Sequence, residues 1–298
     1  MRRGFSAAWL AMVSVGLMLP AAAGAAPASA VLTGSNGDGT FDASLPCGAG
    51  DGPSWRYAWL GGAASSPGGA LHGSWNGTFE VHDTGNGSAF VPNGDGRLAI
   101  TGERGTGSFE TLGDGSCTNA PLTLATQPDG DPVVTGTLPV VASGGTGSLR
   151  GLTGSGAASI TLELGPGADN LAHVELDADL DVADPQLSVA GTSSRWPSFS
   201  SYLARRLSVS VTVVNAQGAG DAFDVRIAGV SGGTGSFSGV PTGAATIPAG
   251  GSATFAFTMN NAAALRTYSI AVSLAALDGL SSPQPPVSRG ATFRSPLP

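Results

Sequence analysis

The stretch SGGTGSLRGLTGSGAASITLEL, residues 143–164, decides the fold class of this chain. A glycine-rich turn is followed by a segment, 157–164, in which apolar and polar residues alternate. Alternation with a period of two indicates a strand with one buried face. The hexapeptide SGGTGS returns at residues 231–236, and a looser copy, ERGTGSFETLG, begins at Glu103. The same turn chemistry therefore occurs at three places along the chain.

Glycine-rich turns also occur in phosphate-binding and catalytic loops, but the sequence argues against both. A P-loop needs a Lys, and the chain contains none. A dinucleotide fingerprint needs a helix behind the loop, and no helical period follows either hexapeptide. Residues 229–233 match G-x-S-x-G, yet a nucleophile elbow needs a following helix and a His partner, and all three His lie before residue 174. The motif is thus interpreted as a bend between strands.

Other segments with a period of two extend this interpretation to the whole chain. They lie at residues 73–82, 97–101, 132–141, 171–182, 207–215, 222–230, 247–259 and 267–277. Asn-Gly and Asp-Gly pairs between them favour tight hairpin turns. One short helical pattern spans residues 201–207. We therefore predict an all-β protein, an antiparallel β-barrel followed by an Ig-like β-sandwich.

The N-terminus has the pattern of a secretory signal peptide. Arg2 and Arg3 precede a short apolar run, and Ala28-Ser29-Ala30 fits an A-x-A cleavage site. Residues 1–30 are assigned to the signal, which predicts a secreted, extracellular protein. No second long apolar run follows, so no membrane-spanning segment is expected.

The mature chain is acidic. It keeps eleven Arg against twenty-one Asp and Glu, a formal charge of −10. This charge argues against a nucleic acid partner, whose phosphates require Lys and Arg. No cofactor-binding motif is present.

The chain has two cysteines, Cys47 and Cys117. In an oxidising compartment they are expected to form a disulfide, which by the chain-entropy model contributes roughly 3–5 kcal/mol. The alternative, a pair of thiolates on a metal, lacks the C-x-x-C spacing of zinc sites.

A composition change near Asp184-Pro185 divides the mature chain. Residues 31–183 hold both Cys, all the His and most of the Gly turn pairs, and form the predicted barrel domain. Residues 184–280 form the predicted sandwich. Residues 281–298 are rich in Pro and have no period, so they are expected to be a disordered tail.

The region 70–183 resembles the allene oxide cyclase-like and dirigent-like barrels, which commonly show G-G-T-G-x-F-x-G-x-x-G-x-G between two strands. The matching residues are Gly144, Gly145, Thr146, Gly147, Gly151, Gly154 and Gly156, while Leu149 stands where these families usually have Phe. The resemblance implies an eight-stranded antiparallel barrel with a central cavity. No catalytic motif of the plant cyclases is carried over.

The region 185–280 is similar to CARDB-like Ig-like modules of bacterial exported proteins. The shared pattern is a V-x-V-x-N-x-G strand and turn, a P-x-G-x-S strand and a final Y-x-I-x-V strand. The matching residues are Asn215, Gly218, Pro248, Gly250, Ser252 and Tyr268. The resemblance implies a role in adhesion, spacing or display of the neighbouring domain.

Three groups of residues are candidate sites, each with a simpler alternative. Glu175, Asp177, Asp179 and Asp181 lie on one face of a strand and could bind Ca²⁺, although a solvated outer face is favoured. Trp55, Trp59 and Trp75 could stack on sugars, although such residues more often fill a barrel core. His72 and His82 flank one strand, so their separation of about 33 Å argues against a shared metal.

These observations favour a secreted, non-catalytic bacterial protein for extracellular binding, adhesion or display, whose partner would be a cell-envelope protein or a glycan. A cyclase or isomerase acting on a small apolar ligand inside the barrel is the alternative. It would need inward-facing polar groups, with His173 and Glu163 as the first candidates. A carbohydrate-binding module using the Trp cluster is the third hypothesis.

Overall fold

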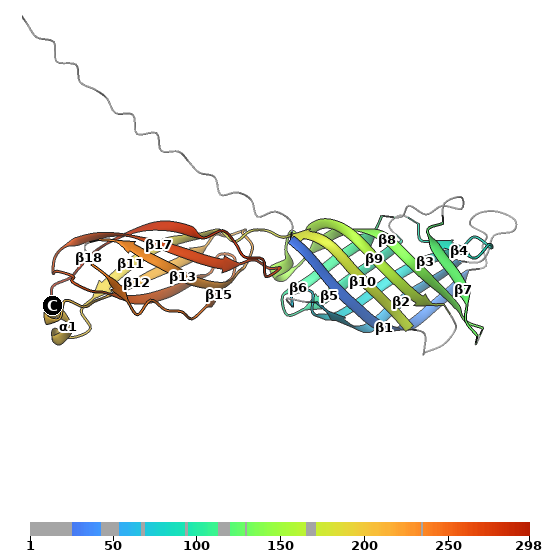
Figure 1. Ribbon diagram of the computed structural model, residues 1–298, viewed down its shortest axis with the longest axis horizontal. Helices are drawn as coiled ribbons and strands as arrows, with labels where there is room; N and C mark the ends of the chain where they lie inside the picture. Colours follow the sequence, from blue (N-terminus) through green and yellow to red (C-terminus); the bar gives the residue numbers. More distant parts are fainter. Residues whose placement is uncertain are drawn as a thin grey trace, which may run out of the picture.

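The computed structural model describes residues 26–42, 54–66, 69–92, 95–112, 120–128, 130–164, 171–233 and 235–298. The described part is nearly all β, as predicted, and forms a barrel and a sandwich joined end to end (Figure 1). The described helices are too short to cross a bilayer. Cys47 and Cys117 lie outside the described residues, so the disulfide stays a prediction.

The first domain is a closed antiparallel barrel. Its strands are β1 (Ala26–Asp42), β2 (Ser54–Ser65), β3 (Gly73–Asp83), β4 (Ser88–Phe90), β5 (Gly96–Gly102), β6 (Gly105–Thr111), β7 (Leu122–Thr126), β8 (Pro132–Gly145), β9 (Thr153–Glu163) and β10 (Leu171–Asp181). Eight of them close a ring in the order β1-β10-β9-β8-β6-β5-β3-β2, and β2 pairs with β1. The short strands β4 and β7 bridge β3 to β8. Because the ring is closed, these eight strands leave no unpaired edge.

The glycine-rich turn at residues 143–148 closes one end of this barrel by packing on its looser copy. The turn continues into a 3₁₀ helix, η1 (Gly147–Leu149). Thr146 and Ser148 donate backbone N–H bonds to the carbonyls of Thr106 and Arg104, in the β5–β6 hairpin. Gly147 has a φ of +60°, and a Cβ there would lie 2.7 Å from the Arg104 carbonyl oxygen. Glycine is therefore required where the two backbones touch.

The described side chains that face the barrel interior are mainly apolar and pack against one another. Among the described residues, the large side chains of this core that are 2 % exposed or less include Leu32, Leu71, Trp75, Phe79, Ile100, Phe109, Leu122, Leu138, Leu149, Leu152 and Leu162. Strand β10 shows the cause, since its residues alternate between buried apolar and exposed polar along its whole length. The resemblance implied a central cavity. In the described residues, packed side chains occupy that position.

The second domain is a sandwich of two four-stranded sheets. Its elements are β11 (Leu187–Arg195), α1 (Phe199–Leu203), β12 (Leu207–Asn215), β13 (Ala222–Gly232), β14 (Phe237–Ser238), β15 (Ala245–Ile247), β16 (Ser252–Met259), β17 (Thr267–Leu277) and β18 (Val287–Arg294). The sheets have the orders β11-β12-β16-β14 and β15-β13-β17-β18. Val209, Val211 and Val213 of β12 are fully buried between the sheets, as their alternation predicts. The predicted helix at 201–207 is shifted, since α1 ends at Leu203 and β12 begins at Leu207.

The expectation of a disordered tail at 281–298 is wrong for β18. This strand pairs with β17 over eight residues, from Thr267 opposite Arg294 to Leu274 opposite Val287. Ala291 and Phe293 face the core and are 8 % and 5 % exposed. The Pro-rich residues before β18 concealed this short alternation. Residues 287–294 are ordered because they cover the edge of β17, which would otherwise be unpaired.

The two domains meet through specific polar contacts. The Arg104 guanidinium donates to the carbonyl of Gly279 at 2.9 Å and lies 4.4 Å from the centroid of the Phe223 ring. Ser148 of the glycine-rich turn donates its hydroxyl to Asp221 at 2.8 Å. Leu280 packs against the barrel core. The turn that closes the barrel thus also joins it to the sandwich, which favours a stiff connection.

A buried carboxyl accompanies this junction. Asp278 is 5 % exposed, and its carboxyl oxygens accept bonds from the N–H groups of Leu280 and Ser282 and from the Gln284 side chain. Burial raises the pKa of Asp278 in spite of these bonds, and the charge of Asp181 raises it further. Burial lowers the pKa of Arg104, although the nearby negative charge of Asp278 acts to raise it. Both charges are therefore partly removed from water at the junction.

Candidate functional site

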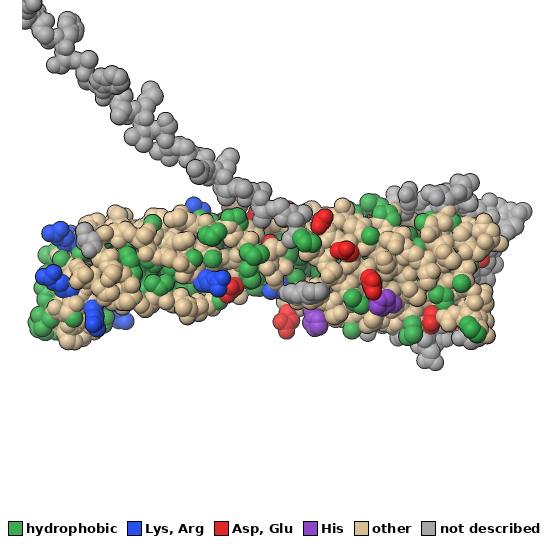
Figure 2. All heavy atoms as spheres, in the orientation of Figure 1, with side chains coloured by type: hydrophobic (Ala, Val, Ile, Leu, Met, Phe, Trp, Pro, Cys, Tyr) green, Lys and Arg blue, Asp and Glu red, His purple; other side chains and the backbone are tan. Residues whose placement is uncertain are grey.

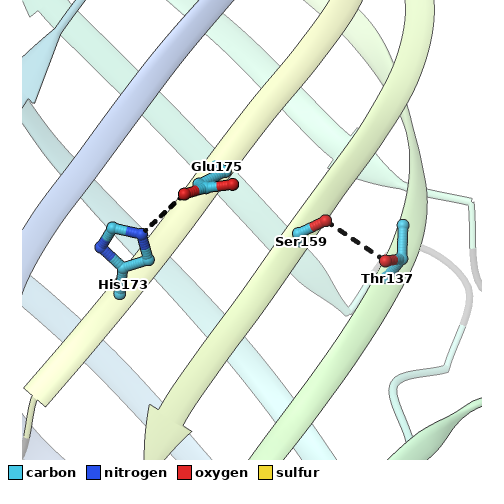
Figure 3. A network of polar contacts seen from close by, with 4 residues as sticks. All are labelled: Thr137, Ser159, His173 and Glu175. Carbon is cyan, nitrogen blue, oxygen red and sulfur yellow. Dashed lines mark hydrogen bonds and ion pairs between the residues drawn. The ribbon is translucent and has the colours of Figure 1, made fainter.

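The residues suggested for catalysis inside the barrel lie on its outside. His173 and Glu175 share the outer face of β10, with side-chain exposures of 42 % and 64 %, and their side chains are 3.3 Å apart (Figure 3). The hydroxyl groups of Thr137 on β8 and Ser159 on β9 form a hydrogen bond on the same outer surface. Glu163 accepts bonds from the Gln127 side chain and the Leu171 N–H. Neither His173 nor Glu163 faces an internal ligand site.

The acidic row on β10 also faces outward. Glu175, Asp177 and Asp179 are exposed, and Asp181 is half-buried near the junction. Their neighbours across the flanking strands are Val31, Ser29 and Pro27 on β1 and Ser159, Ala157 and Ser155 on β9. The described residues hold no group of three His, Cys, Asp or Glu arranged to bind a metal ion. The geometry thus provides a solvated acidic face, and a Ca²⁺ site here stays a prediction.

Trp75 belongs to the core. Its ring is 2 % exposed, and its Nε1 donates to the Thr33 carbonyl at 3.0 Å. It has no free face on which a sugar could stack. The side chains of Trp55 and Trp59 lie outside the described residues.

His72 and His82 stand at opposite ends of β3, as their separation predicted. His82 lies 3.2 Å from Glu80 and stacks on Phe90, with ring centroids 5.1 Å apart. These two His are therefore not brought together.

An open groove of about 510 Å³ lies on the outer face of the barrel, over β3, β5, β6 and β8. Its volume falls in the usual range for small-molecule sites, roughly 300–1,000 Å³. The polar side chains that line it are Asn76, Thr78, Arg97, Ser108, Glu110 and Ser143. We call this feature the polar groove.

Two rows of paired residues across three strands form the groove. Thr78, Arg97 and Glu110 lie opposite one another on β3, β5 and β6, and Arg97 and Glu110 approach to 3.9 Å. In the second row, Asn76 and Ser108 flank Ala99. The small side chains of Ala99 and Ser108 in the second row leave space, whereas the long side chains of Arg97 and Glu110 in the first row form a rim.

A β-bulge produces the fourth side of the groove. Ser108 pairs with Gly144 and Phe109 with Ala142, so Ser143 is an extra residue on β8. A bulge bends its strand and redirects the inserted side chain. Ser143 begins the motif SGGTGS, so the first residue of the motif lines the groove while Ser148 contacts the sandwich. The polar groove was missed from sequence because alternation shows only that these residues face outward.

The groove offers both hydrogen-bond donors and acceptors, from an amide, three hydroxyls, a guanidinium and a carboxylate. Such a set suits a polar ligand rich in hydroxyl groups. The described lining contains no His and no Cys, and its one paired carboxylate is exposed.

Comparison of the chain with protein families, curated proteins and solved structures gives no match.

Proposed function

We propose that this protein is a secreted, non-catalytic binding and display protein. The barrel presents its outer polar surface to an extracellular partner, and the sandwich holds the barrel at a distance from its attachment. The partner of the polar groove would be a glycan or another hydroxyl-rich component of the cell envelope. The resemblances to an allene oxide cyclase-like barrel and to a CARDB-like module agree with such an exported protein.

The observation that carries this proposal is the apolar packing of the barrel interior in the part of the chain that the structure describes. A cyclase or isomerase needs a cavity in which polar groups converge on an apolar substrate. Here Trp75, Phe79 and Phe109 occupy the interior, and Thr111 is the buried polar side chain among the described residues of the barrel strands, where its hydroxyl accepts from the Gly96 N–H. The contacts at the junction add support, since a display protein benefits from a fixed spacing between its domains.

A glycan array and a pull-down from envelope extract test the proposal. We expect a retained hydroxyl-rich ligand, and at least about tenfold weaker binding in an Arg97→Ala, Glu110→Ala variant, because each lost charged hydrogen bond contributes about 1.5–3 kcal/mol. Arg150→Ala, which removes an exposed Arg from the barrel outside the groove, is the matched control and should bind normally. No ligand in either screen, or unchanged binding by the double variant, would contradict the proposal.

The structure also allows a prediction of the site at which the signal peptide is cleaved. Strand β1 begins at Ala26, and Ala26–Ala30 pair with residues 176–180 of β10. Ala30 is 1 % exposed in the core. A cut after Ala30 would remove five paired residues, whereas a cut after Ala25, at the triplet Ala23-Gly24-Ala25, would leave β1 whole. We therefore expect N-terminal sequencing of the exported protein to begin at Ala26; a chain beginning at Val31 would contradict this.

A further inference from the structure

The charges of the two domains are opposite. Residues 31–184 carry four Arg and eighteen Asp or Glu, a formal charge of −14, whereas residues 185–298 carry seven Arg and three Asp, a formal charge of +4. The three Asp of the second domain are Asp221, Asp224 and Asp278. Asp221 and Asp278 lie at the junction, and Asp224 follows Phe223, which packs on Arg104. The far end of the sandwich is therefore left without an acidic residue.

Five Arg gather at that far end. Figure 2 shows basic side chains at the end of the sandwich away from the barrel, together with apolar side chains. The residues are Arg195, Arg205, Arg206, Arg266 and Arg294, all exposed. They come from segments far apart in the chain: Arg195 pairs with Ser208 next to the Arg205-Arg206 turn, and Arg294 pairs with Thr267 next to Arg266. No carboxylate of the described residues forms an ion pair with any of the five.

Large apolar side chains are exposed among these Arg. Phe199 and Leu203 of α1 are 68 % and 67 % exposed, Leu265 is 50 % exposed, and Leu297 is 67 % exposed. They are four of the seven exposed large apolar residues in the described part of the protein. We call these four residues and the five Arg the basic tip. An apolar patch of this kind marks an interaction surface.

The basic tip is held in place by contacts beneath it. The Phe199 ring lies 6.0 Å from that of Tyr202, which packs edge-on against Trp196 at 5.2 Å, and Trp196 donates to the Pro296 carbonyl. The Arg205 carbonyl accepts from the Ala262 N–H, which joins the two loops of the tip. Arg205 and Leu265 have φ angles of +54° and +56°. This left-handed conformation disfavours non-glycine residues, so the surrounding contacts hold the two backbone turns in place.

We propose that the basic tip docks on a lipid bilayer that contains anionic phospholipids. Guanidinium groups pair with lipid phosphates, while Phe199, Leu203, Leu265 and Leu297 enter the interfacial region. A protein partner would require a concave apolar acceptor with carboxylates around it. A second copy is a poor acceptor, since the outer face of its acidic strand β10 has Val31, Ser29 and Pro27 on one side and Ser159, Ala157 and Ser155 on the other, and of these six only Val31 is a large exposed apolar residue for Phe199 to contact. The docked protein would project its barrel away from the membrane.

This inference goes beyond the proposed function, because it concerns a different surface at the opposite end of the molecule. It is tested with the full chain and with vesicles of phosphatidylcholine, alone or mixed with an equal amount of phosphatidylglycerol. We expect co-sedimentation only with the anionic vesicles and a decrease at high salt. An Arg205→Glu, Arg206→Glu variant should bind at least about tenfold more weakly, since each Arg near an anionic surface contributes about 1 kcal/mol.

Two further variants separate insertion from charge attraction. Phe199→Ser with Leu203→Ser should weaken binding about tenfold or more, and Phe199→Trp should give a blue-shifted emission on anionic vesicles. Arg150→Glu reverses one exposed Arg on the barrel and is the matched control for Arg206→Glu alone; it is expected to bind like the wild type. Absence of binding to anionic vesicles, an equal loss in the Arg150→Glu control, or head-to-tail oligomers in sedimentation that the tip variants abolish would overturn the proposal. A negative glycan screen would leave these vesicle results unaffected.

Discussion

Replacing Trp75 with alanine should destabilise the barrel more than any other single truncation in its core. The ring is 2 % exposed and its Nε1 bonds to the Thr33 carbonyl at 3.0 Å, so the variant loses packing and leaves that carbonyl without its donor. Loss of a buried aromatic costs about 3–5 kcal/mol, and loss of the part-buried hydrogen bond to Thr33 about 0.5–1.5 kcal/mol more. We expect the urea midpoint of the barrel transition, followed by circular dichroism, to fall accordingly.

A second substitution shows whether the ring itself is the cause. Gly62 of β2 lies against Nε1 of Trp75, and a Cβ at this position would overlap the ring. Gly62→Ala should therefore cost about 1–3 kcal/mol in the wild type. In the Trp75→Ala background its cost should fall by at least about 1 kcal/mol, because the ring has gone. Equal costs in both backgrounds would show that Trp75 does not pack against β2.

The Asn215→Ala variant should strongly destabilise the sandwich. Asn215 is 2 % exposed, its Nδ2 donates to the carbonyls of Gly220 and Ile247 at 2.7 and 3.1 Å, and its Oδ1 accepts from the Gln186 N–H at 2.9 Å. One side chain thus joins the linker, the β12–β13 loop and β15. Three backbone groups lose their partner at once, at about 1–3 kcal/mol each where buried, so we expect a loss of roughly 3–5 kcal/mol. Thermal unfolding followed by circular dichroism measures it.

Asn260 provides a matched control for this prediction. Its side chain makes two exposed bonds, to the hydroxyls of Ser236 and Ser238. Asn260→Ala should change stability by no more than about 0.5 kcal/mol, as surface substitutions usually do. A similar loss in both variants would mean that burial of Asn215 is not what makes it important.

Much of the fold could be predicted because alternation is local. The period of two in 171–182 correctly placed Leu176 and Leu180 inside and Asp177 and Asp179 outside. The same rule failed at 287–294, where only two buried residues, Ala291 and Phe293, mark the strand after a run of Pro. It also could not show that the barrel interior is filled, because packing depends on which side chains meet across the ring.

The sequence by itself determined the fold class, the outward position of the acidic row and the character of SGGTGS as a turn. Each of these depends on neighbouring residues, since glycine and strand alternation act within a few positions. The tertiary structure alone decided that this turn packs on its copy at Arg104–Thr106 and contacts the sandwich at Asp221. It alone brought Arg195 and Arg294 to one end of the molecule, where Ser194 bonds to the Arg294 carbonyl across 100 residues of chain. The order in which strands pair sets such neighbours, and that order follows from burying the apolar faces of the whole domain together.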